Sequence, residues 1–158
     1  LITGRSKLSG NGTQNDALAT GGEAPTSNAT EEYNGTAWTA SGNLITARYG
    51  LTATGYGEDK AIFGFGFKVG GTEWVSTTNL VTNVGVVGTD VTGVGTIRYN
   101  LAAAGYGTDK AIFAYGYNSS GRVSMSNLVS NVGVVATDVT GVGTARSTHG
   151  NAGYSTSA

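Results

Sequence analysis

The sequence repeats itself with a period of about 50 residues, and this repetition limits the fold more than any other feature. The segment 55–63 returns as 105–113, with Thr108 in place of Glu58 as the only difference. The segment 90–96 returns unchanged as 138–144. A fixed period of this length indicates stacked copies of one supersecondary unit. Stacked copies build extended binding surfaces, so the sequence predicts a scaffold rather than a point where catalytic groups converge.

A recurring Thr-x-Arg tripeptide marks where each copy begins. Its four arginines are Arg5, Arg48, Arg98 and Arg146. They divide the single domain 1–158 into units at 1–43, 44–95 and 96–143, followed by the opening of a fourth unit at 144–158.

Each unit is predicted to consist of short β-strands. The stretch 61–67 is apolar and aromatic at period two, and Asn34-Gly35 predicts a type I′ hairpin between 32–33 and 37–38. Gly and β-branched residues would penalise a helix throughout the chain. Four short strands at this period are typical of a propeller blade, so the expected fold class is all-β.

Composition excludes several kinds of partner. Charged residues make up 12% of the chain, the net charge is −1, and no run of Lys or Arg is present. Binding to nucleic acid or to an anionic membrane through bulk charge is therefore not expected. The chain has no cysteine, which excludes disulfides and thiolate metal sites. No apolar run is long enough for a transmembrane helix, so membrane insertion is not expected either.

The order of several residues resembles the kelch repeat. Arg48-Tyr49-Gly50-Leu51 followed by the segment 60–66 resembles the first two kelch strands, and the first unit has Gly21-Gly22, Tyr33 and Trp38 in kelch order. The later units are similar to degenerate kelch-like repeats of tail-fibre and other structural proteins of aquatic bacteriophages. The resemblance implies kelch-like β-propeller blades and a virion or extracellular location. It also implies a structural or adhesive role without enzymatic activity or cofactor.

Three units and a fraction do not close a propeller, which usually needs four to eight blades. Either more chain exists, or copies assemble into a ring, or the units stack as an open solenoid. The expected partners are therefore further copies of the chain or other virion proteins, and a trimeric fibre segment is another arrangement.

Aromatic side chains are the candidates for ligand binding, because their rings can stack on sugar faces. The aromatic residues considered are Tyr33, Trp38, Tyr49, Trp74, Tyr99, Tyr115, Tyr117 and Tyr154. Trp74 and Tyr117 are expected in the loop region after the apolar strand, where the units differ, and variable tips on a rigid repeat often carry recognition. With Arg122 they form the predicted site for a host-surface glycan.

Two interpretations apply to the repeated arginines. They could ring a channel and bind an acidic or sugar ligand, or each could bond carbonyls or a carboxylate of the next blade; the second is favoured. Asp59 and Asp109 are expected in turns or paired with lysine rather than as calcium ligands, so no metal site is predicted. Asp90 and Asp138 are expected to form Asx-type turns.

No catalytic constellation is recognised. Glu31 and Glu32 are adjacent on a strand and should point to opposite faces, and His149 is the single histidine. Three functions remain open: a virion adhesion module that binds a glycan, a purely architectural capsid or fibre component, and a propeller-type glycan-active enzyme, which ranks last.

Overall fold

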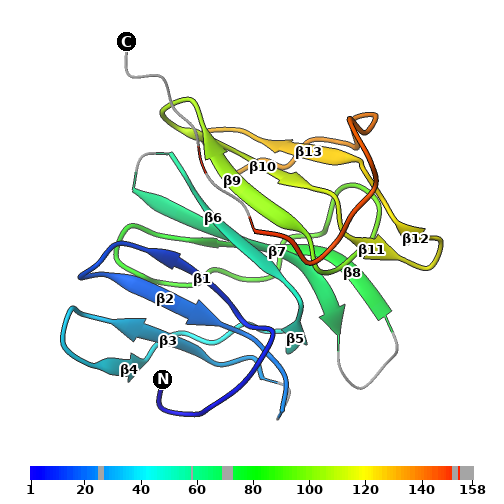
Figure 1. Ribbon diagram of the computed structural model, residues 1–158. Helices are drawn as coiled ribbons and strands as arrows, with labels where there is room; N and C mark the ends of the chain where they lie inside the picture. The colour runs from blue at the N-terminus through cyan, green and yellow to red at the C-terminus, as the bar shows by residue number, and fades with distance from the viewer. Residues whose placement is uncertain (25–26, 58, 69–72, 151–152, 154–158) are drawn as a thin grey trace.

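The computed structural model of the chain describes residues 1–24, 27–57, 59–68, 73–150 and 153 (Figure 1). These residues form thirteen β-strands, all paired antiparallel, and no helix occurs among them. Within the same ranges, no helix could cross a membrane. The predicted all-β class is therefore confirmed.

The first sheet is a four-stranded meander of β1 (Ser9–Gly12), β2 (Ala17–Thr20), β3 (Thr30–Tyr33) and β4 (Trp38–Ala40), in that order. The predicted hairpin between β3 and β4 is present, but the prediction that its turn is of type I′ is wrong. That turn needs positive φ at both central residues, and only Gly35 has one, at 87°. The Asn34 side chain instead accepts hydrogen bonds from the backbone amides of Thr36 and Ala37, at 3.1 and 3.0 Å.

The second sheet contains β5 (Arg48–Tyr49), β6 (Thr52–Tyr56), β7 (Lys60–Lys68) and β8 (Glu73–Val81). Strand β7 lies at its centre, with β5 and β6 on one side and β8 on the other. A β-bulge interrupts the β7–β8 register at Phe65, which has a positive φ of 60°. Beyond β8, bridges from Val81 to Val87 and from Thr78 to Val91 attach an outer segment to the sheet.

The third sheet repeats the second. It contains β9 (Ala102–Tyr106), β10 (Lys110–Ala114) and β13 (Ser126–Val129), and β10 is followed by the small hairpin of β11 (Tyr117–Asn118) and β12 (Gly121–Arg122). Ile62 lies opposite Thr54 and Leu80, and Ile112 lies opposite Ala104 and Leu128. The two sheets therefore share one register, offset by 50 residues in the first strands and by 48 in the later ones.

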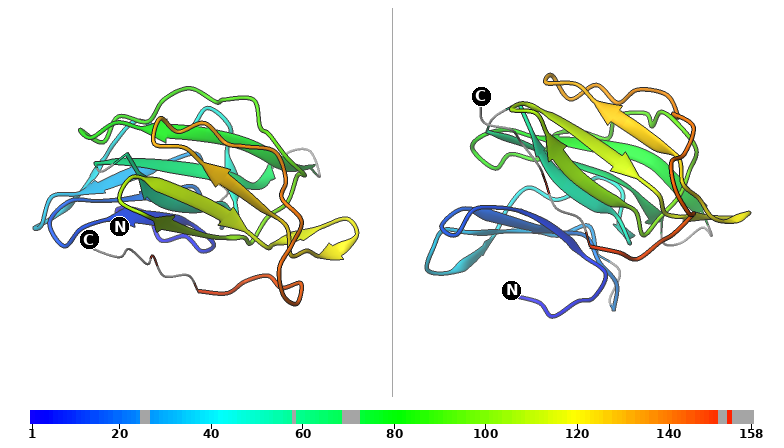
Figure 2. Two further views of the ribbon diagram at one scale, coloured as in Figure 1. Left: turned by 90° about the horizontal axis from the view of Figure 1, so that it is seen from above. Right: turned by 45° about the horizontal axis from the view of Figure 1, so that its top comes forward.

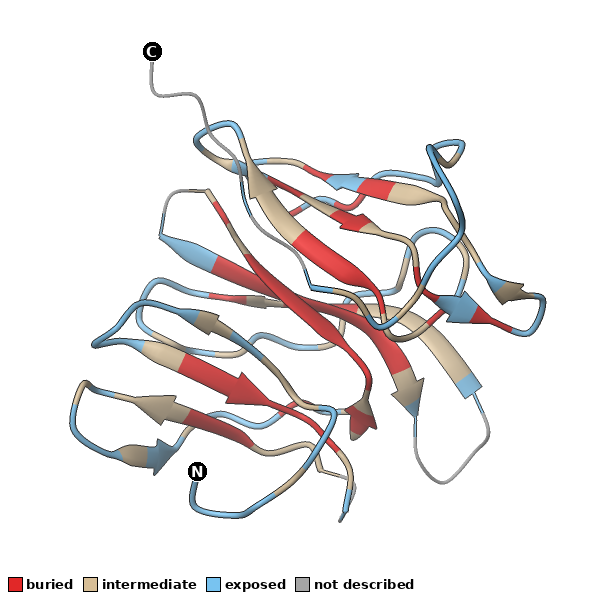
Figure 3. Cartoon of the chain, viewed as in Figure 1, coloured by how far each residue is buried: buried red, intermediate tan, exposed pale blue. Residues whose placement is uncertain are grey.

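The three sheets lie one after another, and the second separates the first from the third (Figures 1 and 2). Strand β6 contacts β1 on one side and β9 and β10 on the other. Successive residues of β7 serve the two interfaces, because Phe63 packs with Leu18 of the first sheet and Ile62 packs with Phe113 of the third. The buried residues are accordingly concentrated in β2, β6, β7, β9 and β10 (Figure 3).

A backbone ladder joins the starts of successive units. Two residues after each repeated arginine, the chain adopts positive φ, at Lys7, Gly50, Asn100 and Thr148, with values of 51°, 59°, 53° and 54°. The amide of each of the last three donates to the carbonyl of the preceding one, at 2.9, 2.8 and 3.0 Å. The opening of the fourth unit at Thr148 thus meets the third as the third meets the second.

Candidate functional site

Five aromatic rings form a continuous row, here called the aromatic row, across the second and third sheets. Its members are Tyr49, Phe67, Trp74, Tyr99 and Tyr117. Phe67 is the hub, with ring centroids 5.3 Å from Tyr49 and 5.9 Å from Trp74. Tyr99 lies 6.0 Å from Phe67 and 5.9 Å from Tyr117, so it carries the row into the third sheet. These separations and the mostly tilted or edge-on orientations are those that aromatic pairs prefer.

Strand register places these rings together. Phe67 of β7 lies directly opposite both Tyr49 of β5 and Trp74 of β8, and Tyr99 forms a bridge with Tyr117. Residues that lie opposite one another on paired strands project from the same face of a sheet. The row is therefore a consequence of pairing in two sheets, and the backbone ladder sets one sheet beside the other.

The row is accessible and has charged groups at both ends. Tyr117 is 37% exposed and the other four rings are half-buried. At one end, the Lys7 ammonium lies 5.2 Å from the Tyr49 ring centroid and pairs with Glu23 at 2.7 Å. The hydrogen bond with Glu23 raises the pKa of Lys7. At the other end, exposed Arg122 lies directly opposite Tyr117.

A pocket lies beside the row. It has a volume of about 340 Å³ and its lining includes the four ladder residues, Lys7, Gly50, Asn100 and Thr148. Gly50 and Asn100 directly follow Tyr49 and Tyr99, so the pocket and the row are adjacent. No carboxylate is among the described residues that line it.

The structure brings the three predicted ligand-binding residues into one region. Trp74 and Tyr117 are connected through Phe67 and Tyr99, and Arg122 adjoins Tyr117. The expected loop position is wrong for both aromatic residues, because Trp74 lies within β8 and Tyr117 lies within β11. Tyr33 and Trp38 form a separate pair on the first sheet, with centroids 5.3 Å apart. Tyr154 lies outside the described residues. Phe67 was not among the predicted site residues, although an aromatic residue after a glycine at the end of an apolar strand occurs again at Tyr117.

The interpretation of the repeated arginines as a ligand-binding ring is wrong for three of the four. The side chains of Arg5, Arg48 and Arg98 are at most 1% exposed. Arg98 donates to the carbonyls of Tyr115 and Thr96 at 2.8 and 2.9 Å and to the Asn127 side chain at 2.5 Å. Its guanidinium also lies 4.4 Å from the Phe65 ring centroid. Burial lowers the pKa of Arg98 to about 10, against the opposing charge of Asp138.

Each buried arginine forms an ion pair with a carboxylate of its own unit. The prediction that its partner lies in the next blade is therefore also wrong. The extended arginine side chain reaches across its own sheet to the outer segment. There Asp90 lies 3.8 Å from Arg48, and Asp138 lies 3.7 Å from Arg98. An asparagine on the intervening strand joins each pair, because Asn79 donates to Asp90 at 2.8 Å and Asn127 to Asp138 at 2.9 Å.

Asp90 and Asp138 do not act as local turn formers. They accept hydrogen bonds from the hydroxyls of Thr46 and Thr96, at 2.5 and 2.6 Å, from 44 and 42 residues away. Sequence reasoning missed these Thr–Arg–Asn–Asp clusters. The available signal was the 48-residue recurrence of the asparagine and the aspartate in otherwise apolar strings.

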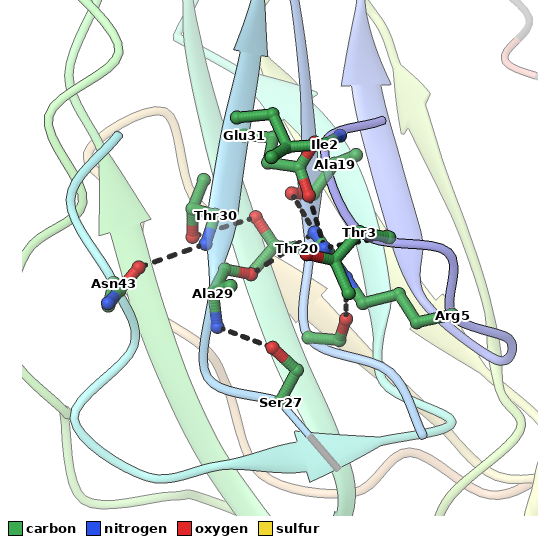
Figure 4. Close-up of polar contacts among 11 residues, drawn as sticks. Ile2, Thr3, Arg5, Ala19, Thr20, Ser27, Ala29, Thr30, Glu31 and Asn43 are labelled. Carbon is green, nitrogen blue, oxygen red and sulfur yellow. Dashed lines mark hydrogen bonds and ion pairs between the residues drawn. The ribbon is translucent and has the colours of Figure 1, made fainter. Parts of the chain in front are cut away.

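The first sheet carries a variant of the cluster (Figure 4). Glu31 of β3 pairs with Arg5 and accepts the Ile2 amide at 2.5 Å. Burial acts to raise the pKa of Glu31, but the bonds from the Ile2 amide and the Arg5 guanidinium outweigh it, and the pKa is lowered. The neighbouring Glu32 points to the other face of the strand, as predicted, and there it lies close to Gly85 of the second unit.

The remaining predicted residues have local contacts. Asp59 pairs with Lys60 at 3.3 Å, and Asp109 pairs with Lys110 at 3.2 Å, at the turns that precede β7 and β10. Arg146 is exposed, and its guanidinium lies 4.6 Å from the Tyr115 ring centroid.

His149 also packs on Tyr115, with ring centroids 5.0 Å apart. It forms no hydrogen bond to a described residue. Across the described ranges, no group of three acidic or histidine side chains could hold a metal.

We expect stability to fall in acid because of these clusters. Burial opposes ionisation of Asp138, yet bonds from Thr96 and Asn127 lower its pKa, as the contacts of Glu31 do for that residue. A lowered folded-state pKa contributes stability that is complete above the ordinary values of 4.5 and 3.8 and is lost as the pH falls below them. Urea unfolding between pH 7 and pH 2.5 measures this. Glu31→Gln should flatten the profile, and an unchanged slope in that variant would contradict the assignment.

No protein-family model matches the chain, and no curated protein is significantly similar to it.

Proposed function

We propose that this chain is a non-catalytic adhesion module in which kelch-like β-propeller blades present the aromatic row to a saccharide of a host-cell surface. The single observation that carries the proposal is the row itself, five neighbouring rings that remain accessible on a rigid scaffold. Aromatic rings offer sugars an apolar face, and tyrosine adds a polar group at its edge. A row that crosses two sheets offers positions for more than one sugar ring.

The charged ends of the row supply polar recognition. Lys7 and Arg122 are hydrogen-bond donors at opposite ends, and the adjacent pocket adds the Asn100 side chain. Such donors would fix the orientation of a sugar whose apolar face rests on the rings. The resemblance to phage tail-fibre proteins supports a virion or extracellular setting in which such a surface would meet a glycan.

An enzymatic role is not part of the proposal. Cleavage of a glycosidic bond usually requires two carboxylates about 5–10 Å apart at the scissile bond. Glu31, Asp90 and Asp138 are each engaged by an arginine or by threonine and asparagine side chains. Turnover of a polysaccharide by the purified chain would overturn this part of the proposal.

We expect Trp74→Ala and Tyr117→Ala each to weaken saccharide binding about tenfold or more. Removing one ring takes away an aromatic contact of about 0.5–1.5 kcal/mol together with its buried area. Binding is measured on a glycan array and then by calorimetry with the best saccharide. Trp38→Ala is the matched control, because it removes an aromatic ring from the separate pair on the first sheet. Equal losses in all three variants would contradict a site at the row.

A purely architectural role is the second candidate. It is favoured by exposed apolar residues on the outer segments of the second and third units, which suit contacts with other protein subunits better than contacts with sugars. A chain that binds no member of a broad glycan array but forms stable assemblies would support this candidate instead.

A further inference from the structure

Two outer segments of the chain are nearly identical and both expose valines. The segments 82–96 and 130–144 differ only at Thr82, which is Ser130 in the second copy, and at Gly88, which is Ala136. We call them the valine edges. Their exposed valines are Val84, Val86, Val91 and Val94 in one edge and Val132, Val134, Val139 and Val142 in the other. The first three equivalent positions agree closely, as with Val84 and Val132 at 71% and 69%, whereas Val94 is 36% exposed and Val142 is 81% exposed.

Each valine edge is bonded to its sheet along one side. In the second sheet, the Val91 amide donates to the Thr78 carbonyl at 2.8 Å, and the Gly88 amide donates to the Leu80 carbonyl at 2.8 Å. In the third sheet, the Val139 amide donates to Ser126 at 2.8 Å, and the Ala136 amide donates to Leu128 at 2.8 Å. Among the described residues, the amides of Thr89, Thr92, Thr137 and Thr140 form no hydrogen bond, and they lie between or beside these inward-bonded positions. Residues 82–86 and 130–134 form turns that are closed by their own hydrogen bonds. Over the rest of the paired stretch, around 88–92 and 136–140, the opposite side of each segment is therefore an open sheet edge.

The valine edges lack the features that normally protect an open edge. Exposed edge strands are usually guarded by charged residues, by proline or by covering loops. The valine edges contain no Lys, Arg, Glu or Pro, and their only charged residues are Asp90 and Asp138. Both aspartates are directed inward to the arginine clusters. What remains on the outside is mainly valine, threonine and glycine, with Asn83 and Asn131 at the turns, and valine and threonine favour strand pairing.

We propose that the valine edges are self-association surfaces, on which a valine edge of a second copy of the chain pairs antiparallel. A second copy is the occupant that fits, because every copy carries the same edge twice and can match it in register. Pairing there would continue an existing sheet by one strand, with the same type of hydrogen bond that already attaches the edge to β8 or β13. The net charge of −1 gives little repulsion between copies.

The presence of two edges has a consequence for assembly. Two copies related by a two-fold axis could pair one edge each and leave the others free, or copies could continue into a longer array. The surface goes beyond saccharide binding and does not depend on it, since no residue of the aromatic row belongs to a valine edge.

The test is the mass of the full chain in solution, measured by sedimentation velocity from low micromolar to high micromolar concentration. The wild-type chain is expected to form dimers or larger species as the concentration rises. The variant Val86→Lys/Val134→Lys places one charge on each edge and should remain monomeric over the same range. Val86→Thr/Val134→Thr keeps β-branched side chains and should still associate.

The matched control is Ile2→Lys/Ile45→Lys, which introduces the same charges at residues that are 62% and 65% exposed outside the valine edges. It should associate like the wild type. Far-UV circular dichroism shows whether each variant is folded. A wild-type chain that stays monomeric, or a control that dissociates as fully as the edge variant, would overturn the proposal.

Discussion

We expect Arg98→Met to lower the free energy of unfolding by about 3 kcal/mol. Removing one partner of a buried ion pair leaves the remaining polar groups buried without hydrogen-bond partners. The methionine can fill much of the space of the arginine stem, but it leaves buried Asn127 without its donor. It also leaves the Tyr115 carbonyl without the Arg98 hydrogen bond and removes the cation that lies over the Phe65 ring. The loss thus combines polar groups left unpaired and a weakened contact between the second and third sheets.

Urea unfolding followed by circular dichroism measures this change. Arg122→Met is the matched control, because Arg122 is exposed on a hairpin and its replacement should change stability by about 0.5 kcal/mol or less. If Arg98→Met behaved like Arg122→Met, the buried cluster would have no role in holding the third unit together.

Replacing Gly93 and Gly141 together with alanine should destabilise the chain by about 2–6 kcal/mol, if each overpacked site costs about 1–3 kcal/mol and the two sites add. A Cβ at Gly93 would lie 2.1 Å from the Ser76 Oγ and 2.2 Å from the Ser76 carbonyl oxygen. A Cβ at Gly141 would lie 2.0 Å from the Ser124 Oγ and 2.4 Å from the Ser124 carbonyl carbon. Because backbone atoms are involved, a change of serine rotamer cannot relieve the clash.

Gly4→Ala is the control for this pair. A Cβ at Gly4 has no neighbour within 4 Å, and neither Gly4 nor Gly93 nor Gly141 has a positive φ. Any difference among these variants therefore reports close packing and not backbone strain. A thermal melting temperature for the double variant equal to that of Gly4→Ala would show that the outer segments do not lie against β8 and the segment that leads into β13.

The repeat and the all-β class could be predicted because both depend on local patterns. The segment 61–67 alternates at period two, and β7 runs from Lys60 to Lys68. The face on which each phenylalanine lies could not be predicted from that pattern. Strict alternation places Phe63, Phe65 and Phe67 on one face, but the bulge at Phe65 shifts the register. As a result Phe63 packs toward the first sheet, Phe65 toward the third, and Phe67 joins the aromatic row.

The candidate site was predictable in part for the same reason. Trp74 and Tyr117 were identifiable as aromatic residues that follow an apolar strand, but their connection depends on Phe67 and Tyr99 and hence on two different sheet registers. The arginine clusters required contacts between residues 29 to 44 positions apart, such as Arg98 with Asn127 and Thr46 with Asp90. No periodicity in the sequence specifies which repeated polar residues will meet at that distance.

The backbone ladder has a consequence for how this molecule could diversify. The hydrogen bonds of the ladder join main-chain atoms, so they form whichever side chains stand at its four positions. The chain has lysine, glycine, asparagine and threonine there. Those side chains line one pocket. A lineage of such proteins could therefore exchange the chemistry of that pocket one residue at a time while the main-chain frame stays constant.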